Sequence, residues 1–314
     1  MNERIGSDTP DAGRFVTRRV SRQETEYPAL LRDVPDAPEC LYVRGALVSE
    51  DALAVAVVGS RQATPYGAAI AEDLSGALAS RGVTVVSGLA RGIDSAAHRG
   101  ALRVGGRTIA VLGSGVDIIY PPENRRLAAE IERHGAIVSQ FAPGTPPLAH
   151  HFPARNRVIA GLALGVVVVE AAEHSGALIT ARVAAELGRE VMAVPGRATS
   201  LQSRGAHALI RDGAALVQSW EDVIAELPAR WRECIGPGPD ELRHDGHNAR
   251  RDEPEDRDSQ ALLGVFADEP LTMDDLIEKS GLDSGRAAAL VLQLELHGRI
   301  RQIDGRRFVQ VGRE

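Results

Sequence analysis

Between residues 54 and 196 the chain repeats one pattern, in which an uninterrupted apolar run leads into a turn that contains glycine. The turn glycines that follow the five runs are Gly59, Gly88, Gly113, Gly176 and Gly196. Strands covered on both faces of a sheet have continuous Val, Ile and Leu runs, whereas half-exposed strands alternate apolar and polar residues. Open α/β sheets bind ligands outside the carboxyl ends of their strands. The pattern therefore predicts a parallel β-sheet with its functional loops at the carboxyl edge.

Segments with helical character separate the apolar runs. The segment 65–81 has the clearest limits, since Thr64 is a preferred N-cap, Pro65 suits the first helical position and Gly82 suits a helix end. The predicted strands are 54–58, 83–87, 108–112, 136–139, 166–170 and 190–194, and the other predicted helices are 94–104, 124–134, 154–164 and 179–187. This alternation predicts an α/β fold with right-handed crossovers and helices on both faces of the sheet.

The segments that flank this region differ in composition. Residues 1–26 are expected to form a flexible tail, and the proline-punctuated segment 27–45 is expected to wrap the sheet. Residues 228–258 carry few apolar side chains that could order them by burial, which predicts a disordered linker. The sheet domain is thus expected to span residues 27–227.

Residues 259–314 have the pattern of three short helices, at 259–266, 273–280 and 284–297, followed by two short strands. Asp304-Gly305 lies between these strands, and this dipeptide favours a tight hairpin. Three helices and a hairpin predict a small C-terminal winged-helix domain.

Composition and charge narrow the location and the partners. The chain has 314 residues and a formal net charge of −7, and none of its apolar stretches approaches the roughly 20 residues of a membrane span. Its first 20 residues are polar with mixed charge, unlike a signal peptide, so we expect a cytoplasmic protein without a membrane partner. The net charge argues against a polyanionic partner, yet residues 54–227 carry 16 Arg against 15 Asp and Glu. The sheet domain is therefore the least acidic part of the chain.

Two residue types exclude several chemistries. Lys279 is the only lysine, so the sheet domain contains no P-loop lysine, Schiff-base lysine or lysine base. Cys40 and Cys234 match no zinc or redox spacing. We expect no metal and no cofactor.

The turn Gly59-Ser60-Arg61 follows a predicted buried strand and precedes a predicted helix. Its glycine is expected to let backbone N–H groups approach an anion, and the Arg61 guanidinium has the planar donors that suit phosphate. One such turn is as well explained as a tight turn with a surface arginine, but similar turns recur after the next two strands, at 87–94 and 113–115. Ile118 takes the place of the last glycine of G-x-G-x-x-G, so a dinucleotide-binding motif is not complete.

A basic segment opens the helix that precedes the strand 166–170. Arg155 and Arg157 are two residues apart and point to different sides of a helix, so we expect one to face a ligand and the other to tie loops together. Phe152 could stack on a nucleobase, as aromatic residues of single-strand binders do. The alternative is a hydrophobic staple in front of the helix.

Candidate catalytic residues are sparse. Asp94 and His98 are four residues apart, but Asp94 is better explained as an N-cap. Glu170 and its neighbours Glu173 and His174 could form an acid/base pair at the sheet edge, although no nucleophile or second carboxylate motif accompanies them. These patterns favour a protein that is not an enzyme.

Taken together, the turns at 58–61, 87–94 and 111–115 and the segments 152–157, 175–180 and 194–196 closely resemble the DNA-processing protein A family, DprA or Smf. The resemblance covers residues 27–227. It implies an extended Rossmann-like domain that binds single-stranded DNA, forms homodimers and loads the RecA recombinase during natural transformation. The helical domain that often precedes the sheet in this family is expected to be missing here, because only a short segment precedes Tyr27.

The resemblance also implies which residues contact DNA and which form the dimer. The implied DNA contacts are Gly59, Ser60, Arg61, Gly88, Arg91, Gly113, Ser114, Phe152, Arg155, Asn156 and Arg157. The implied dimer surface lies within 206–217 and includes His207 and Leu216, of which Leu216 is nearly as well explained as a buried strand residue.

Two other functions are compatible with the pattern. The fold also resembles the lysine-decarboxylase-like nucleotide phosphoribohydrolases, but the chain has no Pro-Gly-Gly-x-Gly-Thr loop, and Ser175-Gly176-Ala177 is its nearest match. A winged-helix regulator that reads duplex DNA would use the helix 284–297, whose only Arg or Lys is Arg286. A protein-docking role suits that domain at least as well.

Overall fold

The computed structural model describes residues 16–236, 257–266, 270–296, 300–303 and 307–310. The chain divides into two compact units, Met1–Asp240 and Glu241–Glu314. The predicted tail up to residue 15, and the predicted linker from 237 to 256, lie outside the described residues.

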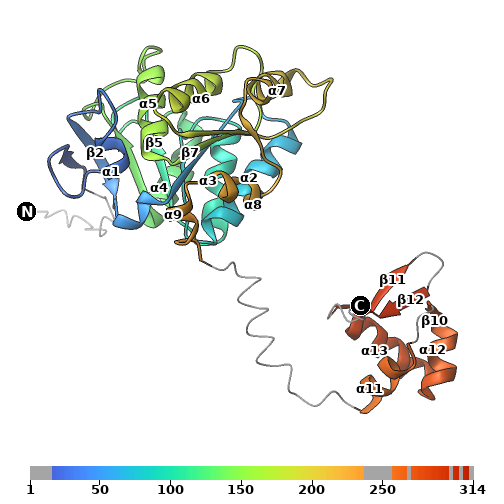
Figure 1. The fold of residues 1–314 in the computed structure, drawn as a ribbon. Coiled ribbons are helices and arrows are strands. Elements are labelled where there is room, and N and C mark those ends of the chain that lie inside the picture. The colour runs from blue at the N-terminus through green and yellow to red at the C-terminus, as the bar shows by residue number, and fades with distance from the viewer. Residues whose placement is uncertain (1–15, 237–256, 267–269, 297–299, 304–306, 311–314) are drawn as a thin grey trace, which may run out of the picture. The chain divides into compact units, whose positions relative to one another are not determined.

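The first unit is built on a nine-stranded sheet with the order β1-β2-β6-β5-β4-β3-β7-β8-β9 (Figure 1). The strands are β1 (Arg18–Ser21), β2 (Cys40–Gly45), β3 (Ala54–Val58), β4 (Thr84–Ser87), β5 (Thr108–Val111), β6 (Ala136–Ser139), β7 (Gly165–Val168), β8 (Glu190–Ala193) and β9 (Ala215–Leu216). Strands β3 to β9 pair in parallel, whereas β1 and β2 are antiparallel additions at the β6 edge. The predicted parallel sheet is confirmed.

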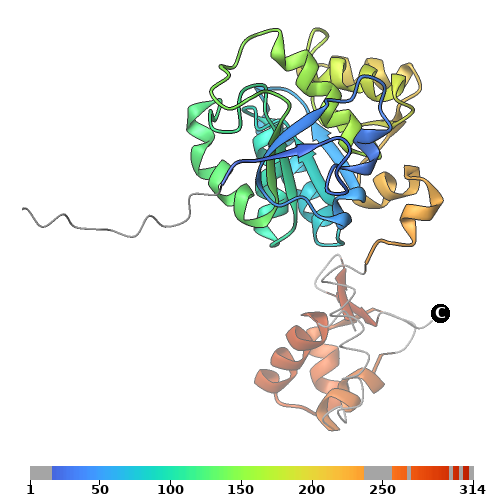
Figure 2. The ribbon, with the colours of Figure 1, turned by 90° about the vertical axis from the view of Figure 1, so that its left-hand side faces the viewer.

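Helices cover both faces of this sheet (Figure 2). They are α1 (Ala29–Arg32), α2 (Pro65–Ala79), α3 (Ile93–Arg103), α4 (Arg125–His134), α5 (His151–Leu162), α6 (Gly176–Glu186), α7 (Arg204–Arg211), α8 (Trp220–Glu226) and α9 (Ala229–Arg232). On β3 the side chains of Ala54, Ala56 and Val58 pack with α1, α5 and α6, and those of Val55 and Val57 pack with α2, α3 and α8. All five are buried, which explains why the sequence shows no alternation there.

Helix limits follow their caps. The Thr64 hydroxyl accepts a hydrogen bond from the Gly67 backbone N–H and opens α2 at Pro65, as predicted. Helix α6 begins at Gly176, three residues before its predicted start, because the Ser175 hydroxyl accepts a hydrogen bond from the Ala177 N–H. Helix α5 also begins earlier, at His151.

The prediction that the flexible tail continues to residue 26 is wrong. Residues 18–21 form β1 against β2, and Val20 is 1% exposed. The Tyr27 hydroxyl donates a hydrogen bond to the Pro38 carbonyl at 2.8 Å, and its ring is buried, which fastens the proline-rich segment to the sheet domain. The first residues of the predicted linker are also ordered, since α9 follows Pro228 and Trp231 packs against the core.

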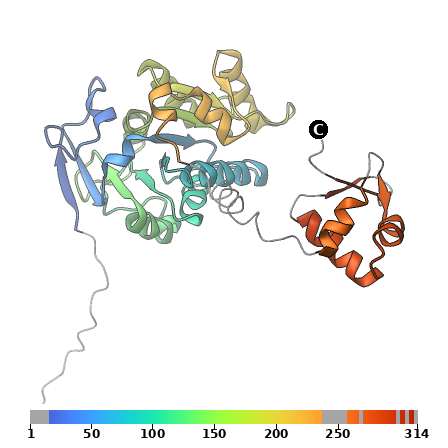
Figure 3. The same cartoon turned by 60° about the horizontal axis from the view of Figure 1, so that its bottom comes forward.

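The second unit contains α11 (Arg257–Gly264), α12 (Met273–Ser280) and α13 (Ser284–Leu296), with a three-stranded antiparallel sheet (Figure 3). Its strands are β10 (Leu271–Thr272), β11 (Ile300–Ile303) and β12 (Arg307–Gln310). Leu262, Leu276, Leu290 and Phe308 belong to one buried cluster that joins the helices to the sheet. The predicted winged-helix architecture is confirmed, and the Asp304-Gly305 turn lies outside the described residues.

Candidate nucleic-acid interface

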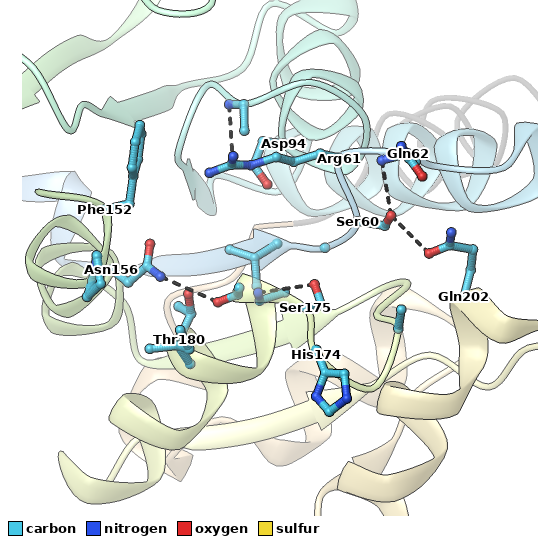
Figure 4. Close-up of a pocket in the computed structure, with 18 of the residues that line it drawn as sticks. Ser60, Arg61, Gln62, Asp94, Phe152, Asn156, His174, Ser175, Thr180 and Gln202 are labelled. Carbon is cyan, nitrogen blue, oxygen red and sulfur yellow. Dashed lines mark hydrogen bonds between the residues drawn. The ribbon is translucent and has the colours of Figure 1, made fainter. Parts of the chain in front are cut away.

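The loops that follow β3, β4 and β5, together with the starts of α5 and α6, enclose two adjoining cavities at the carboxyl edge of the sheet (Figure 4). The larger cavity has a volume of about 840 Å³ and the smaller one about 230 Å³. Arg61, Phe152 and Arg155 line both cavities and mark the place where they meet. Ligand sites of proteins commonly have volumes of about 300–1,000 Å³, so the larger cavity is of the usual size for a ligand.

Ten of the eleven predicted DNA contacts line these cavities. The larger cavity is lined by Gly59, Ser60 and Asn156, the smaller by Gly88, Arg91, Gly113 and Ser114, and both by Arg61, Phe152 and Arg155. Arg157 lines neither, because its guanidinium donates hydrogen bonds to the Pro35 carbonyl at 3.0 and 3.2 Å. The sequence thus predicted a set of residues that the fold brings together, with one exception.

The Arg61 side chain is exposed at the junction of the cavities. Its guanidinium carbon lies 5.2 Å from the centre of the Phe152 ring, within the range of a cation–π contact. Within the described part of the chain, no hydrogen bond or ion pair engages this guanidinium. Arg61 therefore presents an exposed positive charge to whatever occupies the cavities.

The Phe152 ring is held by its surroundings. Tyr120 lies 6.2 Å away, centre to centre, and a side chain at Gly113 would place its first carbon 3.0 Å from the ring. Phe152 is the second residue of α5 rather than a residue in front of it, so the hydrophobic-staple interpretation is wrong. Its ring is partly exposed at the cavity wall, where a ligand can contact it.

Arg155 has a different environment from Arg61. It is 5% exposed, and it donates hydrogen bonds to the carbonyls of Gly88 and Val111, the latter at 2.8 Å. Burial lowers the pKa of its guanidinium to about 10, which still leaves it protonated at neutral pH. Arg155 therefore both lines the site and joins the ends of β4 and β5, two roles that the sequence analysis divided between Arg155 and Arg157.

Asp94 faces this buried guanidinium from α3. Its carboxylate accepts hydrogen bonds from the backbone N–H groups of Gly88 and Ala90, at 3.2 and 3.4 Å. Burial raises the pKa of Asp94, and the charge of Arg155 opposes that rise. The N-cap of α3 is Gly92, with φ of 74°, so Asp94 lies in the first turn and braces the preceding loop instead of capping the helix.

The glycine turns were predicted to let backbone N–H groups approach an anion, and this prediction is wrong in part. The Ser60 N–H donates to the Glu170 carbonyl at 2.7 Å and the Gly88 N–H donates to Asp94, so neither is free for an anion. A side chain at Gly59 would meet Ile93 at 2.6 Å, and one at Gly88 would meet the guanidinium carbon of Arg155, also at 2.6 Å. These two glycines are required by packing within the protein.

The remaining predicted polar contacts are engaged internally. The Ser60 hydroxyl donates to Gln202 at 3.1 Å, and the Ser114 hydroxyl donates to the Ile118 carbonyl at 2.6 Å. Asn156 accepts from the Arg155 Nε at 3.1 Å. Arg91 is exposed and forms an ion pair with Glu123 at the mouth of the smaller cavity.

The structure also accounts for the candidate catalytic residues. Glu170 is 4% exposed and accepts hydrogen bonds from the Thr64 N–H and hydroxyl, at 2.9 and 2.6 Å, so its carboxylate anchors α2. His98 is buried with its Nδ1 2.7 Å from the Thr108 hydroxyl, and burial lowers its pKa to about 3. Across the described residues, no three metal-ligating side chains come together, and no helix is long and apolar enough to cross a membrane.

Several cavity residues were not predicted as contacts. They include Gln62, Tyr120, Glu173, His174, Ser175, Gly176, Thr180, Gln202 and Arg204. Ser175-Gly176 follows an apolar run as the other turns do, and that recurrence could have identified it. Gln202 comes from a short 3₁₀ helix, Leu201–Ser203, which the sequence pattern did not predict.

The doubly covered parallel sheet, with an exposed arginine and an aromatic ring at its carboxyl edge, defines a Rossmann-like α/β protein with a candidate anion site. Residues 18–228 match the family described as DNA recombination-mediator protein A, and residues 247–306 match the DprA winged helix domain. The chain belongs to the DprA/Smf family, as its motifs indicated.

Similar proteins come from several bacteria. Protein Smf of Synechocystis is 37% identical over 92% of this chain and 79% of its own length, and Protein Smf of Escherichia coli is 42% identical over 89% and 74%. The solved structure of DNA processing protein A from Streptococcus pneumoniae has a TM-score of 0.64 and 46% identity, and covers 68% of this chain and 75% of that one. DNA processing protein A from Helicobacter pylori, whose structure was described for its single-stranded DNA binding mode, has a TM-score of 0.58 and 30% identity, with 63% and 91% covered.

Proposed function

We propose that this chain binds single-stranded DNA at the two carboxyl-edge cavities and passes it to the RecA recombinase during natural transformation. The observation that carries the DNA site is the exposed Arg61 guanidinium, which forms no hydrogen bond or ion pair within the described residues and lies over Phe152. Its donors are therefore open to a phosphate, since arginine offers several donors in one plane.

The neighbouring ring suits the second part of a nucleotide. Aromatic side chains bind bases of any sequence by stacking, and basic residues beside them follow the sugar-phosphate backbone. Arg61 and Phe152 bring these two functions to one place, which supports single-stranded rather than duplex DNA, because the bases of a duplex are already stacked on each other. The H. pylori relative supports the same ligand.

We propose RecA loading and the homodimer from the family resemblance, and the cytoplasmic location from the composition of the chain. For the dimer, the chain offers Leu216, which is 49% exposed on the edge strand β9, so its interpretation as a buried residue is wrong. His207 lies on α7, where its Nε2 is 3.1 Å from the Gly196 carbonyl oxygen. We propose that the surface around these two residues pairs two copies of the sheet domain, and that the winged-helix domain docks a protein.

The proposal includes no enzymatic activity. A nucleotide phosphoribohydrolase needs a carboxylate that can reach the substrate, and the Glu170 carboxylate is instead hydrogen-bonded to Thr64 and does not line the larger cavity. Glu173 lines the larger cavity, but its carboxylate is paired with the Arg204 guanidinium at 3.5 Å.

One titration tests the proposal against these alternatives. The full chain is titrated with a fluorescent thymidine oligonucleotide and with a duplex of equal length, and is assayed for base release from nucleoside monophosphates. We expect preferential binding of the single strand and no base release. Preference for the duplex would favour the winged-helix regulator, and base release would favour the enzyme.

A further inference from the structure

The larger cavity extends well beyond Arg61 and Phe152. Its opposite wall is formed by the start of α6, where Ser175, Gly176, Ala177 and Thr180 line the cavity (Figure 4). None of these residues was expected to contact DNA, and none belongs to the pair that carries the proposed DNA site. The proposed contacts of Arg61 and Phe152 therefore do not account for this wall of the cavity, which can bind a further group of the ligand.

Thr180 gives the first indication of that group. The residue is 2% exposed, it lines the cavity, and no group in the described parts of the chain forms a hydrogen bond with its hydroxyl. Its oxygen is not among the buried side-chain atoms that lack a partner, so it is open to the cavity and can donate a hydrogen bond to a group that enters it. A hydroxyl that faces a cavity in this state is suited to a polar ligand.

The end of α6 gives the second, independent indication. The helix has eleven residues, its first turn contains no Asp or Glu, and the Ser175 side chain already caps the Ala177 N–H at 3.3 Å. A side chain at Gly176 would meet no atom within 4 Å, so a ligand can approach the helix end closely. The N–H groups of a first helical turn and the helix dipole favour an anion there.

We propose that the α6 end, through Thr180 and the Gly176 N–H, binds a second backbone phosphate of the DNA strand that Arg61 engages. This inference rests on the proposed function. It adds the path of the DNA strand, which would cross the larger cavity from Arg61 to α6. A volume of about 840 Å³ leaves room for more than the nucleotide held at Arg61. The ligand is a phosphodiester, whose charged oxygens can accept hydrogen bonds from the Thr180 hydroxyl and the Gly176 N–H, while the charge of the nearby Glu173 is paired with Arg204.

The test combines Thr180→Val in the full chain with thymidine oligonucleotides that carry one uncharged methylphosphonate linkage, placed at each position in turn. Valine keeps the shape of threonine and removes only the hydroxyl. We expect Thr180→Val to weaken binding of the unmodified strand about tenfold. At one linkage other than the one sensitive to Arg61→Ala, the methylphosphonate should cost less affinity in Thr180→Val than in the parent.

The controls distinguish failure of the α6 phosphate site from failure of the proposed DNA-binding function. Thr180→Ser keeps the hydroxyl and should bind the strand as the parent does. Thr180→Val should also unfold at the same temperature as the parent or higher, because no protein hydrogen bond is lost. Unchanged affinity of Thr180→Val, or a loss equal at every linkage, would overturn the α6 phosphate site while leaving DNA binding at Arg61 intact. If Arg61→Ala had no effect either, the proposed function itself would be wrong.

Discussion

Arg61 and Phe152 meet at a distance of 5.2 Å although one follows β3 and the other lies in the first turn of α5. The strand β3 leads to the cation and the helix α5 carries the aromatic ring, so the candidate site needs both elements. The crossovers of the parallel sheet bring the two loops to one edge, where a cation lies over an aromatic face. The contact leaves the guanidinium exposed, and the first prediction depends on that exposure.

Arg61→Ala should weaken single-strand binding without unfolding the protein. Loss of one charge-assisted contact costs roughly 1.5–3 kcal/mol, or about ten- to over a hundredfold in affinity. Each phosphate contact adds about −0.7 to the slope of log affinity against log salt, so the slope should become shallower. Arg126→Ala, an exposed arginine on α4 that lines neither cavity, is the matched control. If Arg61→Ala and the parent bound the single strand with the same affinity at every salt concentration, the proposed site would be ruled out.

Arg155→Ala should act mainly on stability. The change removes the partner of two backbone carbonyls and leaves the buried Asp94 carboxylate without a nearby buried positive charge. Breaking a buried charge arrangement of this kind costs about 3–5 kcal/mol, and denaturant unfolding measures it. Arg157→Ala, on the more exposed side of the same helix, should cost far less. A fully stable Arg155→Ala protein would contradict the structural role of this arginine.

Gly113→Ala should weaken DNA binding through the ring of Phe152. The added carbon would lie 3.0 Å from that ring, which must then move by a few tenths of an ångström. Base stacking on an aromatic side chain contributes about 1–3 kcal/mol, so a partial loss should lower affinity by less than Phe152→Ala does. Gly113→Ala added to Phe152→Ala should have no further effect. If Gly113→Ala lowered the affinity equally in the parent and in Phe152→Ala, the glycine would not act through the ring.

His98 should make the sheet domain sensitive to acid. Burial lowers the pKa of its imidazole to about 3, against about 6.5 in an unfolded chain, so only the unfolded state takes up a proton between these values. The stability that is present above pH 6.5 is therefore lost as the pH falls toward 3, by about 1.4 kcal/mol per pH unit. Urea unfolding at pH 7 and pH 5 should show a smaller difference for His98→Gln than for the parent. An unchanged difference would assign the acid sensitivity to other groups.

Leu216→Arg should give a folded monomer. The side chain is 49% exposed on the edge strand β9, so the substitution places a charge on the surface proposed for pairing and leaves the core intact. Light scattering with circular dichroism measures mass and folding together. Val104→Arg, at an apolar residue of similar exposure after α3, should remain a dimer. A parent protein that is already monomeric would exclude the proposed dimer.

The parallel core was predictable because burial on both faces leaves a visible mark in the sequence. Val55 to Val58 and Val166 to Val169 form unbroken apolar runs, and Thr64-Pro65 marks the start of α2. The antiparallel strands β1 and β2 leave no such mark. Arg18 and Arg19 in β1 are exposed, and in β2 the buried Leu41 and Val43 alternate with less buried residues, so neither strand is an unbroken run of Val, Ile and Leu.

The candidate site was predictable in its location and less so in its chemistry. Strand ends of a parallel sheet meet at one edge, and ten of the residues implied by the family resemblance line the cavities there. Burial of Arg155 was not predictable, since its carbonyl partners Gly88 and Val111 depend on how two neighbouring strands end. Nor was Gln202, which comes from a later connection and reaches Ser60 across the larger cavity.

The packing around Gly59 and Gly88 affects how genetic screens of this protein should be interpreted. A selection for loss of the proposed single-strand binding would recover substitutions at both glycines alongside those at Arg61, although the space beside the glycines is filled by Ile93, Asp94 and Arg155. Clones altered at the glycines should have low cellular abundance, whereas Arg61 clones should accumulate normally. A measurement of protein abundance in each clone therefore distinguishes residues proposed to contact the strand from residues that support the fold around them.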